Sequence, residues 1–256
     1  ALIVMYHDLA ESIGDVAPGH RPYVLAPAVF RRQMKLADET GLRALSLSEW
    51  CAGGAPGAAL AITFDDGHVS NHALALPILV EFALKATFFI TAGRIGTGGT
   101  MSWPELRALH RAGMEIGSHT LTHRPPSTLD DRELRHELVE SRRILEDGLG
   151  APVTSISSPT GFFNARMSDI AREVGYRALC IGRIGLARDQ GDSFSLNRVA
   201  VKRAMGEAQF RALLRHDRMT LASMRARQWI RELARETMSV ESYLRLRRLL
   251  MRAKAD

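Results

Sequence analysis

Cysteine and long apolar runs are both scarce in this sequence. The two cysteines, Cys51 and Cys180, stand alone with no CxxC spacing, which argues against a zinc ribbon or a disulfide framework and predicts buried free thiols. The apolar stretches at the start and between Leu74 and Leu84 fall far short of the roughly 20 residues that a membrane-spanning helix needs. With 46% hydrophobic and 24% charged residues, the composition is that of an ordinary globular protein.

Most of the chain has no excess of positive or negative residues. The formal net charge is +6, and residues 211–256 hold 12 Lys or Arg against 5 Asp or Glu. The basic character therefore belongs to this tail, and residues 1–210 are close to neutral.

A basic segment followed by an apolar run, the signature of a secretory signal, does not open the sequence. We therefore expect a cytoplasmic or membrane-peripheral protein. The chain begins without Met, which leaves room for an upstream signal removed by processing or cloning.

Short β-rich runs alternate with segments of helical spacing, such as that of Phe30, Met34 and Ala37. The eight candidate strands are Leu2–Tyr6, Arg43–Leu47, Leu60–Phe64, Lys85–Ile90, Glu115–Ser118, Ser155–Ser158, Arg177–Ile181 and Ser195–Val201. Connections of this length cannot form tight hairpins, so the strands should pair in parallel. A glycine-rich phosphate loop after the first strand is missing. The pattern predicts an α/β fold of the (β/α) barrel type over residues 1–210.

The tail predicts two basic helices, roughly Thr220–Thr237 and Val240–Arg252, as a helical extension over residues 211–256. Apolar and basic residues alternate there at helical spacing, so the first helix is amphipathic as well as cationic. We expect it to dock on the barrel, lie on a membrane surface or bind a partner, in preference to binding nucleic acid.

Two adjacent carboxylates follow the third candidate strand, in the run TFDDG at 63–67. Neighbouring side chains point in different directions, so one of Asp65 and Asp66 can bind a cation while the other accepts a proton. The alternative is a plain turn, because Asp before Gly is common in turns.

Two histidines, His119 and His123, follow the fifth candidate strand in the run SHTLTH at 118–123. Neutral imidazoles four residues apart on one helical turn converge and could hold one metal ion. The alternative is a chance pair of surface histidines. A second pair with this spacing, His68 and His72, could line the same cleft.

These polar groups all stand directly after strands. In a parallel barrel, the carboxyl ends of different strands meet at one rim. His7, the Asp pair, His119 and the SSPTG segment at 157–161 should therefore share one cleft. This coincidence favours a functional site over separate turns and surface histidines.

Together, the TFDDG run, the SHTxTH run and the Pro-x-Gly segment, in this order, resemble the polysaccharide deacetylases of the NodB-homology group, carbohydrate esterase family 4. The resemblance covers about residues 1–210. It implies a distorted barrel of seven or eight strands. It also implies hydrolysis of N-acetyl groups on amino sugars of a polysaccharide, oligosaccharide or glycolipid precursor, with release of acetate.

The resemblance implies that Asp65 is the general base and that Asp66, His119 and His123 hold a divalent metal ion. This donor set leaves positions open for water and substrate. Zn²⁺ is the first choice, and Co²⁺, Ni²⁺, Mn²⁺ and Fe²⁺ accept the same ligands.

The third motif departs from the family pattern. The family usually has Arg-x-Pro-Tyr-Gly, whereas residues 157–161 read Ser-Ser-Pro-Thr-Gly, so the Arg that orients the base and the Tyr are both absent. The backbone N–H of Thr160 can still stabilise the oxyanion, because a backbone donor depends on the chain path. Pro159, Gly161 and Phe162 are the predicted substrate-binding neighbours.

The general acid has two candidates. The run LRH at 214–216 only faintly resembles the family's late Leu-x-x-His motif, and helical spacing places His216 on a helix. The run MYHD at 5–8 resembles the opening strand of a circularly permuted subgroup, typified by exopolysaccharide N-deacetylases, in which an early Tyr-His supplies the acid. We therefore favour His7.

Two other functions are compatible with these residues. The altered third motif would suit a non-catalytic, carbohydrate-binding member of the family. A non-haem Fe(II) oxygenase also uses two His and one carboxylate, although such sites are usually built on β-sandwiches.

Overall fold

The structure is a computed structural model, and it describes residues 1–256 except 15, 54–58, 162–164, 189–190 and 238–256. Contacts divide the chain into two units, Ala1–His216 and Asp217–Asp256. Each unit is considered by itself below.

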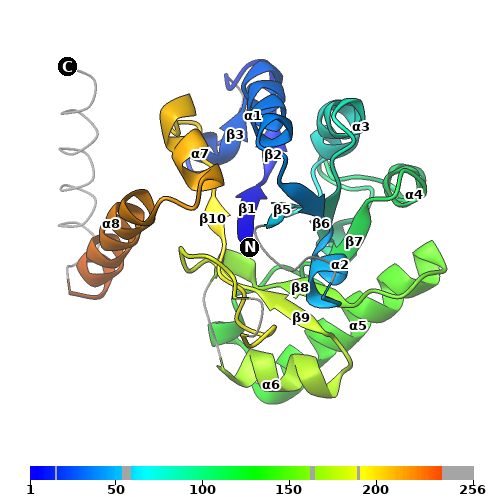
Figure 1. Cartoon of the computed structure of the whole chain (residues 1–256). Helices are drawn as coiled ribbons and strands as arrows, with labels where there is room; N and C mark the ends of the chain where they lie inside the picture. The colour runs from blue at the N-terminus through cyan, green and yellow to red at the C-terminus, as the bar shows by residue number, and fades with distance from the viewer. Residues whose placement is uncertain (15, 54–58, 162–164, 189–190, 238–256) are drawn as a thin grey trace. The chain divides into compact units, whose positions relative to one another are not determined.

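The first unit is built around one curled parallel sheet (Figure 1). Its strands, in spatial order, are β10 (Val199–Ala200), β1 (Leu2–Tyr6), β5 (Ala59–Phe64), β6 (Ala86–Ile90), β7 (Glu115–Ser118), β8 (Ser155–Ser157) and β9 (Ala178–Cys180). A further strand, β4 (Arg43–Leu45), pairs with the first half of β5. Leu196, just ahead of β10, forms a parallel bridge to Cys180 of β9 and so brings the two ends of the sheet together. The predicted distorted (β/α) barrel is confirmed.

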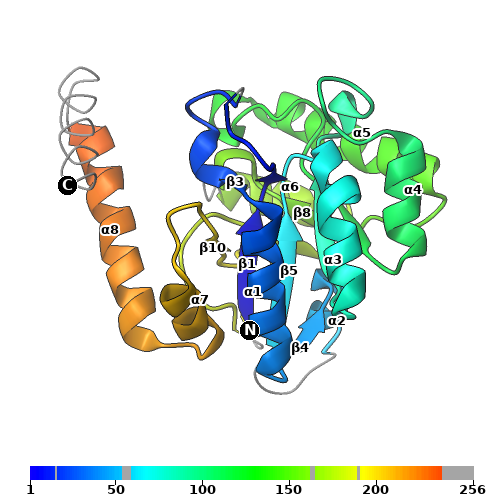
Figure 2. The ribbon, with the colours of Figure 1, turned by 90° about the horizontal axis from the view of Figure 1, so that it is seen from above.

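Helices connect the strands and cover the outside of the sheet, with α1 and α3 side by side (Figure 2). They are α1 (Pro27–Glu39), α2 (Leu47–Cys51), α3 (Leu76–Glu81), α4 (Trp103–Arg111), α5 (Asp131–Leu149), α6 (Ala165–Glu173) and α7 (Glu207–Leu214). Short helical turns occur at Arg21–Tyr23, Asn71–Ala75, Ala92–Arg94, Pro126–Thr128 and Pro159–Gly161, and β2 (Asp8–Leu9) pairs with β3 (Val24–Leu25) in a separate small sheet.

Local sequence explains where the helices begin and which face they bury. In α1, the predicted apolar face of Phe30, Met34 and Ala37 is buried. The longest helix of the first unit, α5, begins with a capping box between Asp130 and Glu133, which satisfies amide groups that the first turn leaves unpaired.

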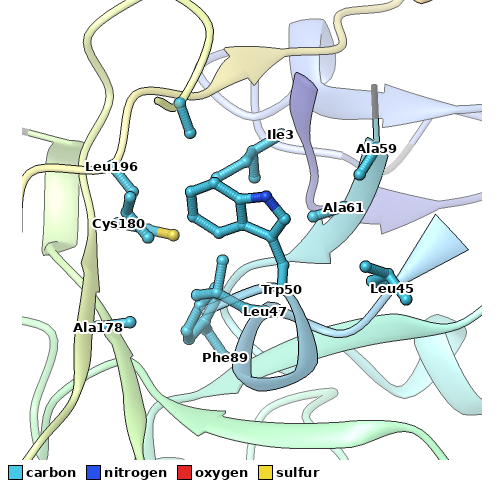
Figure 3. Close-up of a cluster of buried hydrophobic side chains, with 11 residues drawn as sticks. Ile3, Leu45, Leu47, Trp50, Ala59, Ala61, Phe89, Ala178, Cys180 and Leu196 are labelled. Atoms are coloured by element: carbon cyan, nitrogen blue, oxygen red, sulfur yellow. The ribbon is translucent and has the colours of Figure 1, made fainter. Parts of the chain in front are cut away.

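The amino-terminal end of the barrel is filled by α2. Figure 3 shows the indole of Trp50 surrounded by apolar side chains from the strands, among them Ile3, Phe89 and Cys180. At the same end, the carboxylate of Glu115 accepts hydrogen bonds from the backbone amide of Ser48 (2.9 Å) and from the hydroxyls of Thr87 and Ser155 (3.0 and 2.6 Å). This packing leaves the opposite, carboxyl-terminal end of the strands for polar groups.

Five predicted strands are shorter in the structure, three of them by a single residue at one or both ends, and the other two differ as follows. The strand predicted at Arg43–Leu47 ends at Leu45, because the hydroxyl of Ser46 caps α2 by accepting from the amide of Glu49. The run predicted at Ser195–Val201 is reduced to β10, because its first half pairs with β9 instead of β1.

The second unit contains α8 (Arg218–Thr237), which agrees with the first predicted tail helix. The second predicted tail helix, Val240–Arg252, lies outside the described residues. The preceding helix, α7, buries Phe210, Leu213 and Leu214 and packs against α1, so the division falls after His216 and not after residue 210. Among the described helices, no segment is long and apolar enough to cross a bilayer.

The packing inside the sheet predicts the effect of a single methyl group at Gly117 in β7. A Cβ there would lie 2.6 Å from the buried ring of Phe89 and 2.7 Å from the hydroxyl of Ser155. We expect Gly117→Ala to lower the free energy of unfolding by roughly 1–3 kcal/mol through overpacking, as measured by urea denaturation. Gly19→Ala is the control, because a Cβ at Gly19 has no neighbour within 4 Å. Equal losses in both variants would contradict the packing described.

Candidate functional site

The predicted polar residues meet at the carboxyl-terminal end of the barrel strands. His7 follows β1, the pair Asp65 and Asp66 follows β5, and His119 follows β7. Ser157 is the last residue of β8. The expectation that one rim collects these residues from distant parts of the sequence therefore agrees with the structure.

Asp66, His119 and His123 form a three-residue cluster. Oδ1 of Asp66 lies 3.4 Å from Nε2 of His119 and 3.2 Å from Nε2 of His123. Three ligands at the usual bond lengths around a tetrahedral divalent ion are about 3.3 Å apart, so both separations fit. Among the described residues, this is the one group of His, Cys, Asp or Glu whose donor atoms could share an ion.

The imidazole of His119 is held in the tautomer that a metal ligand needs. Its Nδ1 lies 2.9 Å from the backbone carbonyl of Ser157. A carbonyl can only accept, so Nδ1 must donate its hydrogen, and the lone pair of a neutral ring is then on Nε2, which faces Asp66.

The two histidines do not converge on a helical turn, and that prediction is wrong. Residues 119–123 form a loop in which Thr120 and His123 have positive φ angles of 64° and 65°. The carboxylate of Glu137 in α5 accepts hydrogen bonds from the two backbone amides at 121 and 122 (2.9 and 2.8 Å). This anchor to α5, together with the two left-handed residues, brings the rings of His119 and His123 to the same side.

The electrostatics of the cluster favour bound positive charge. Burial alone would raise the pKa of Asp66, but hydrogen bonds from His119, His123 and His68 outweigh it and hold this pKa far below its ordinary value. Burial acts to lower the pKa of His119, but the carboxylates of Asp65 and Asp66 raise it above its ordinary value. The pocket therefore attracts either protons or a cation.

The second oxygen of Asp66 faces His68. Nε2 of His68 lies 3.7 Å from Oδ2 of Asp66, and its Nδ1 lies 4.0 Å from Oδ2 of Asp8. The hydroxyl of Ser70 in turn donates to Asp8 (2.5 Å). Of the second predicted pair, His68 thus borders the site, whereas His72 is not part of the cluster.

Asp65 forms a buried ion pair with Arg198. Two guanidinium nitrogens each lie 2.8 Å from one carboxylate oxygen. The same guanidinium donates to the hydroxyls of Ser157 (2.7 Å) and Thr63 (3.2 Å). Burial acts to raise the pKa of Asp65, but the charge of Arg198 outweighs it and lowers this pKa. Asp65 is therefore an ionised carboxylate with a fixed orientation.

Arg198 is the functional residue that sequence reasoning missed. The family's third motif would place an arginine at the position of Ser157, and here the arginine that contacts Asp65 comes instead from the segment before β10. A signal was present in the run 195–201: Leu196 and Arg198 share one face of an extended chain, and Leu196 packs inside the barrel. A charged residue on an inward face needs an acidic partner.

His7 lies near both carboxylates. Its ring is 4.7 Å from that of Tyr23, and its buried Nδ1 has no hydrogen-bond partner among the described residues. Burial lowers the pKa of His7 to about 4, although Asp65 and Asp66 act to raise it. The imidazole is therefore neutral at pH 7, and its role as general acid stays a prediction.

His216 lies away from this rim. It follows the end of α7, and its pKa is lowered first by burial and then by the amino group of Ala1. Ala1 precedes β1, so it stands at the opposite end of that strand from His7, which a five-residue strand places roughly 16 Å away. The structure does not bring His216 to the Asp and His cluster.

The third-motif segment makes a tight turn next to β9. Thr160 and Gly161 have positive φ angles of 62° and 74°, and the carbonyl of Gly161 accepts from the amide of Gly182 (2.6 Å). A Cβ at Gly161 would lie 2.8 Å from the Cα of Gly182. The path of the Thr160 amide is thus fixed by backbone contact. The roles of Pro159, Thr160 and Gly161 stay predictions, and Phe162 lies outside the described residues.

Two curated bacterial proteins are similar to this chain. The Bacillus subtilis protein YxkH, named as a polysaccharide deacetylase, is 30% identical over 154 residues, which cover 60% of this chain and 55% of that protein. A peptidoglycan-N-acetylglucosamine deacetylase of Bacillus cereus is 27% identical over 121 residues, covering 47% of this chain and 54% of that protein. The chain thus spans about half the length of these relatives.

Solved structures share the fold, and a family model matches the part of the chain that holds the cluster. The Streptococcus pyogenes deacetylase PplD superposes with a TM-score of 0.74 at 22% identity, covering 84% of this chain and 96% of that one. IcaB from Ammonifex degensii gives 0.69 at 22% identity, with 84% and 95% covered. The model for polysaccharide deacetylases matches residues 52–179, half of the chain, including the Asp pair and both cluster histidines. The chain therefore belongs to the polysaccharide deacetylase family.

Proposed function

We propose that this protein is a metal-dependent N-deacetylase. It hydrolyses N-acetyl groups on amino sugars of a polysaccharide, oligosaccharide or glycolipid precursor and releases acetate. One observation carries the proposal: the cluster of Asp66, His119 and His123 lies beside an ionised carboxylate, Asp65, that takes no part in the cluster. The name of the Bacillus cereus relative supports an N-acetylated amino sugar as substrate.

Asp66, His119 and His123 would hold the metal ion, with Zn²⁺ as the first choice and Co²⁺, Ni²⁺, Mn²⁺ or Fe²⁺ as alternatives. Such an ion, when bound, polarises the acetyl carbonyl and makes water more acidic. The carbonyl contact of His119 with Ser157 keeps the coordinating nitrogen in place.

Asp65 would act as the general base that takes a proton from the attacking water. Arg198 lowers its pKa, so the carboxylate is a weak base, but the two contacts with the guanidinium favour its ionised form and hold its orientation. A carboxylate has about four lone-pair sites, so two contacts with Arg198 and a longer one with the hydroxyl of Ser157 (3.3 Å) still leave it able to accept a proton from water.

Departure of the amine requires a proton on the amide nitrogen, because an amide anion is too basic to leave. We assign this step to His7. Since His7 is neutral in the free site, it must gain a proton during the reaction, and the proton that Asp65 takes from water is the available source. The backbone amide of Thr160 is proposed to stabilise the oxyanion of the tetrahedral intermediate.

The two alternative functions are less well supported by the structure. The carbohydrate-binding alternative rested on the missing arginine of the third motif, and Arg198 supplies the same contact to Asp65. The oxygenase alternative would usually need a β-sandwich, and the chain forms a curled parallel sheet instead.

The first prediction concerns acetate release. We expect metal-reconstituted protein to release acetate from at least one of a panel of N-acetylhexosamine glycosides, polymers and lipid-linked sugars. Asp65→Asn should slow this release by roughly 10²–10⁴-fold, the usual contribution of a general base, while metal content is retained. A thermal melt of the variant is needed as a control, because the change also leaves Arg198 without its ion pair. Undiminished turnover by a folded variant would refute the assignment, and binding of an oligosaccharide without acetate release would support the non-catalytic alternative.

The second prediction concerns the metal. Elemental analysis of protein purified without added metal should find about one divalent ion per chain and identify it. Asp66→Ala and His119→Ala should each lose this ion, whereas the control His72→Ala should keep it, because His72 is not part of the cluster. Full metal content in both cluster variants would show that the ion binds elsewhere.

The third prediction concerns the ion pair of Asp65 with Arg198. Arg198→Met should lower the free energy of unfolding by roughly 3–5 kcal/mol, because it leaves a buried carboxylate unpaired. The double variant Asp65→Asn with Arg198→Met should lose clearly less than the sum of the single variants, since neither buried charge remains. Urea denaturation of the four proteins measures this coupling, and strict additivity would mean that the two side chains do not interact.

A further inference from the structure

The helix of the second unit, α8, presents an apolar face to solvent. Met219, Trp229 and Ile230 are 79%, 63% and 57% exposed. With 100° per residue, these three and the exposed Ala222 and Ala226 fall within an arc of about 100°, the width of the apolar stripe of an amphipathic helix. Large exposed apolar side chains gathered on one stripe of a helix indicate an interaction surface.

Arginine side chains border this face on both sides. On the same helical projection, Arg218 and Arg225 lie next to Trp229, and Arg227 lies beyond Ile230 on the other edge. The whole of α8 contains five arginines and two glutamates, Glu232 and Glu236, so the helix has a net charge of +3. The surface is therefore apolar along its centre and cationic along its edges.

We propose that α8 lies on an anionic lipid surface, with its exposed apolar face among the headgroups and the upper acyl chains. Tryptophan is well suited to this depth, because its ring is apolar and its N–H is polar. Arginine side chains at the edges can extend to lipid phosphates while their aliphatic parts stay near the acyl chains. This inference rests on α8 alone and does not depend on the proposed deacetylation.

Two other occupants fit this surface less well. A second copy of the helix packed on the same apolar face would bring two helices of net charge +3 against each other. Nucleic acid would contact the arginines but leave the exposed Trp229 and Ile230 in water. An anionic bilayer satisfies both the apolar centre and the cationic edges.

The test is sedimentation of the full chain with two kinds of vesicle. One contains phosphatidylcholine alone, and the other contains phosphatidylcholine with about 30 mol% phosphatidylserine. We expect binding to the anionic vesicles, weaker binding at high salt because the charges are screened, and little binding to neutral vesicles. The double variant Trp229→Ser with Ile230→Ser should bind at least about tenfold more weakly. Val80→Ser is the matched control, because Val80 is an exposed apolar residue of the first unit (56%) and should have no effect.

Circular dichroism of each variant checks that the helices are retained. Failure of the wild-type chain to sediment, or equal sedimentation of the Trp229 and Ile230 variant, would overturn the proposal. So would a concentration-dependent dimer abolished by the same double change, because the apolar face would then be covered by a second copy. Acetate release from a soluble glycoside is measured in parallel and should not change in these variants, so the two proposals can fail independently.

Discussion

The ion pair between Arg198 and Asp65 is the interaction on which the arrangement of the site depends. Both side chains are almost completely removed from water, and charged groups in that position must be paired and hydrogen-bonded. The guanidinium meets this condition by contacting side chains of β5 and β8 from the segment that precedes β10. These contacts link β5 to β8, which are not neighbours in the sheet. They lie near the bridge between Leu196 and Cys180, where the two ends of the sheet come together. Asp65 is held by Arg198, and Asp66 contacts the histidines.

The backbone conformation explains why the neighbouring carboxylates of Asp65 and Asp66 contact different partners. Asp66 has a φ angle of 74°, a left-handed conformation that is uncommon for residues other than glycine, and Gly67 continues with 76°. Such strain is often found at functional sites, where the surrounding contacts maintain it. In this protein, those contacts are the imidazoles around Asp66 and the ion pair on Asp65. The opposite end of the barrel, around Trp50, is packed with apolar side chains.

The sequence was sufficient to predict the parallel strands and the rim at which the polar residues meet, because both depend on local patterns. Apolar runs marked the strands, and the residues after them marked the rim. The loop at 119–123 could not be predicted, because its shape depends on left-handed residues and on Glu137, which belongs to a later helix. Arg198 was missed because the alternation in 195–201 marks it only as inward-facing, whereas its partner lies 133 residues away along the chain and cannot be identified from spacing. The helix α2 was also missed, since its short length produces almost no periodicity.

The contact of Ser157 with Arg198 has an evolutionary consequence. The hydroxymethyl group at 157 is small enough for the guanidinium of Arg198 to reach past it to Asp65. A second guanidinium at position 157 would add a buried positive charge that Asp65 compensates only in part, which is costly. Homologues should therefore fall into two classes, with the arginine at one of these two positions and a small neutral residue at the other. A lineage that moved the arginine from one position to the other would have passed through an intermediate protein. In that intermediate, positions 157 and 198 would both have carried an arginine, or neither would have.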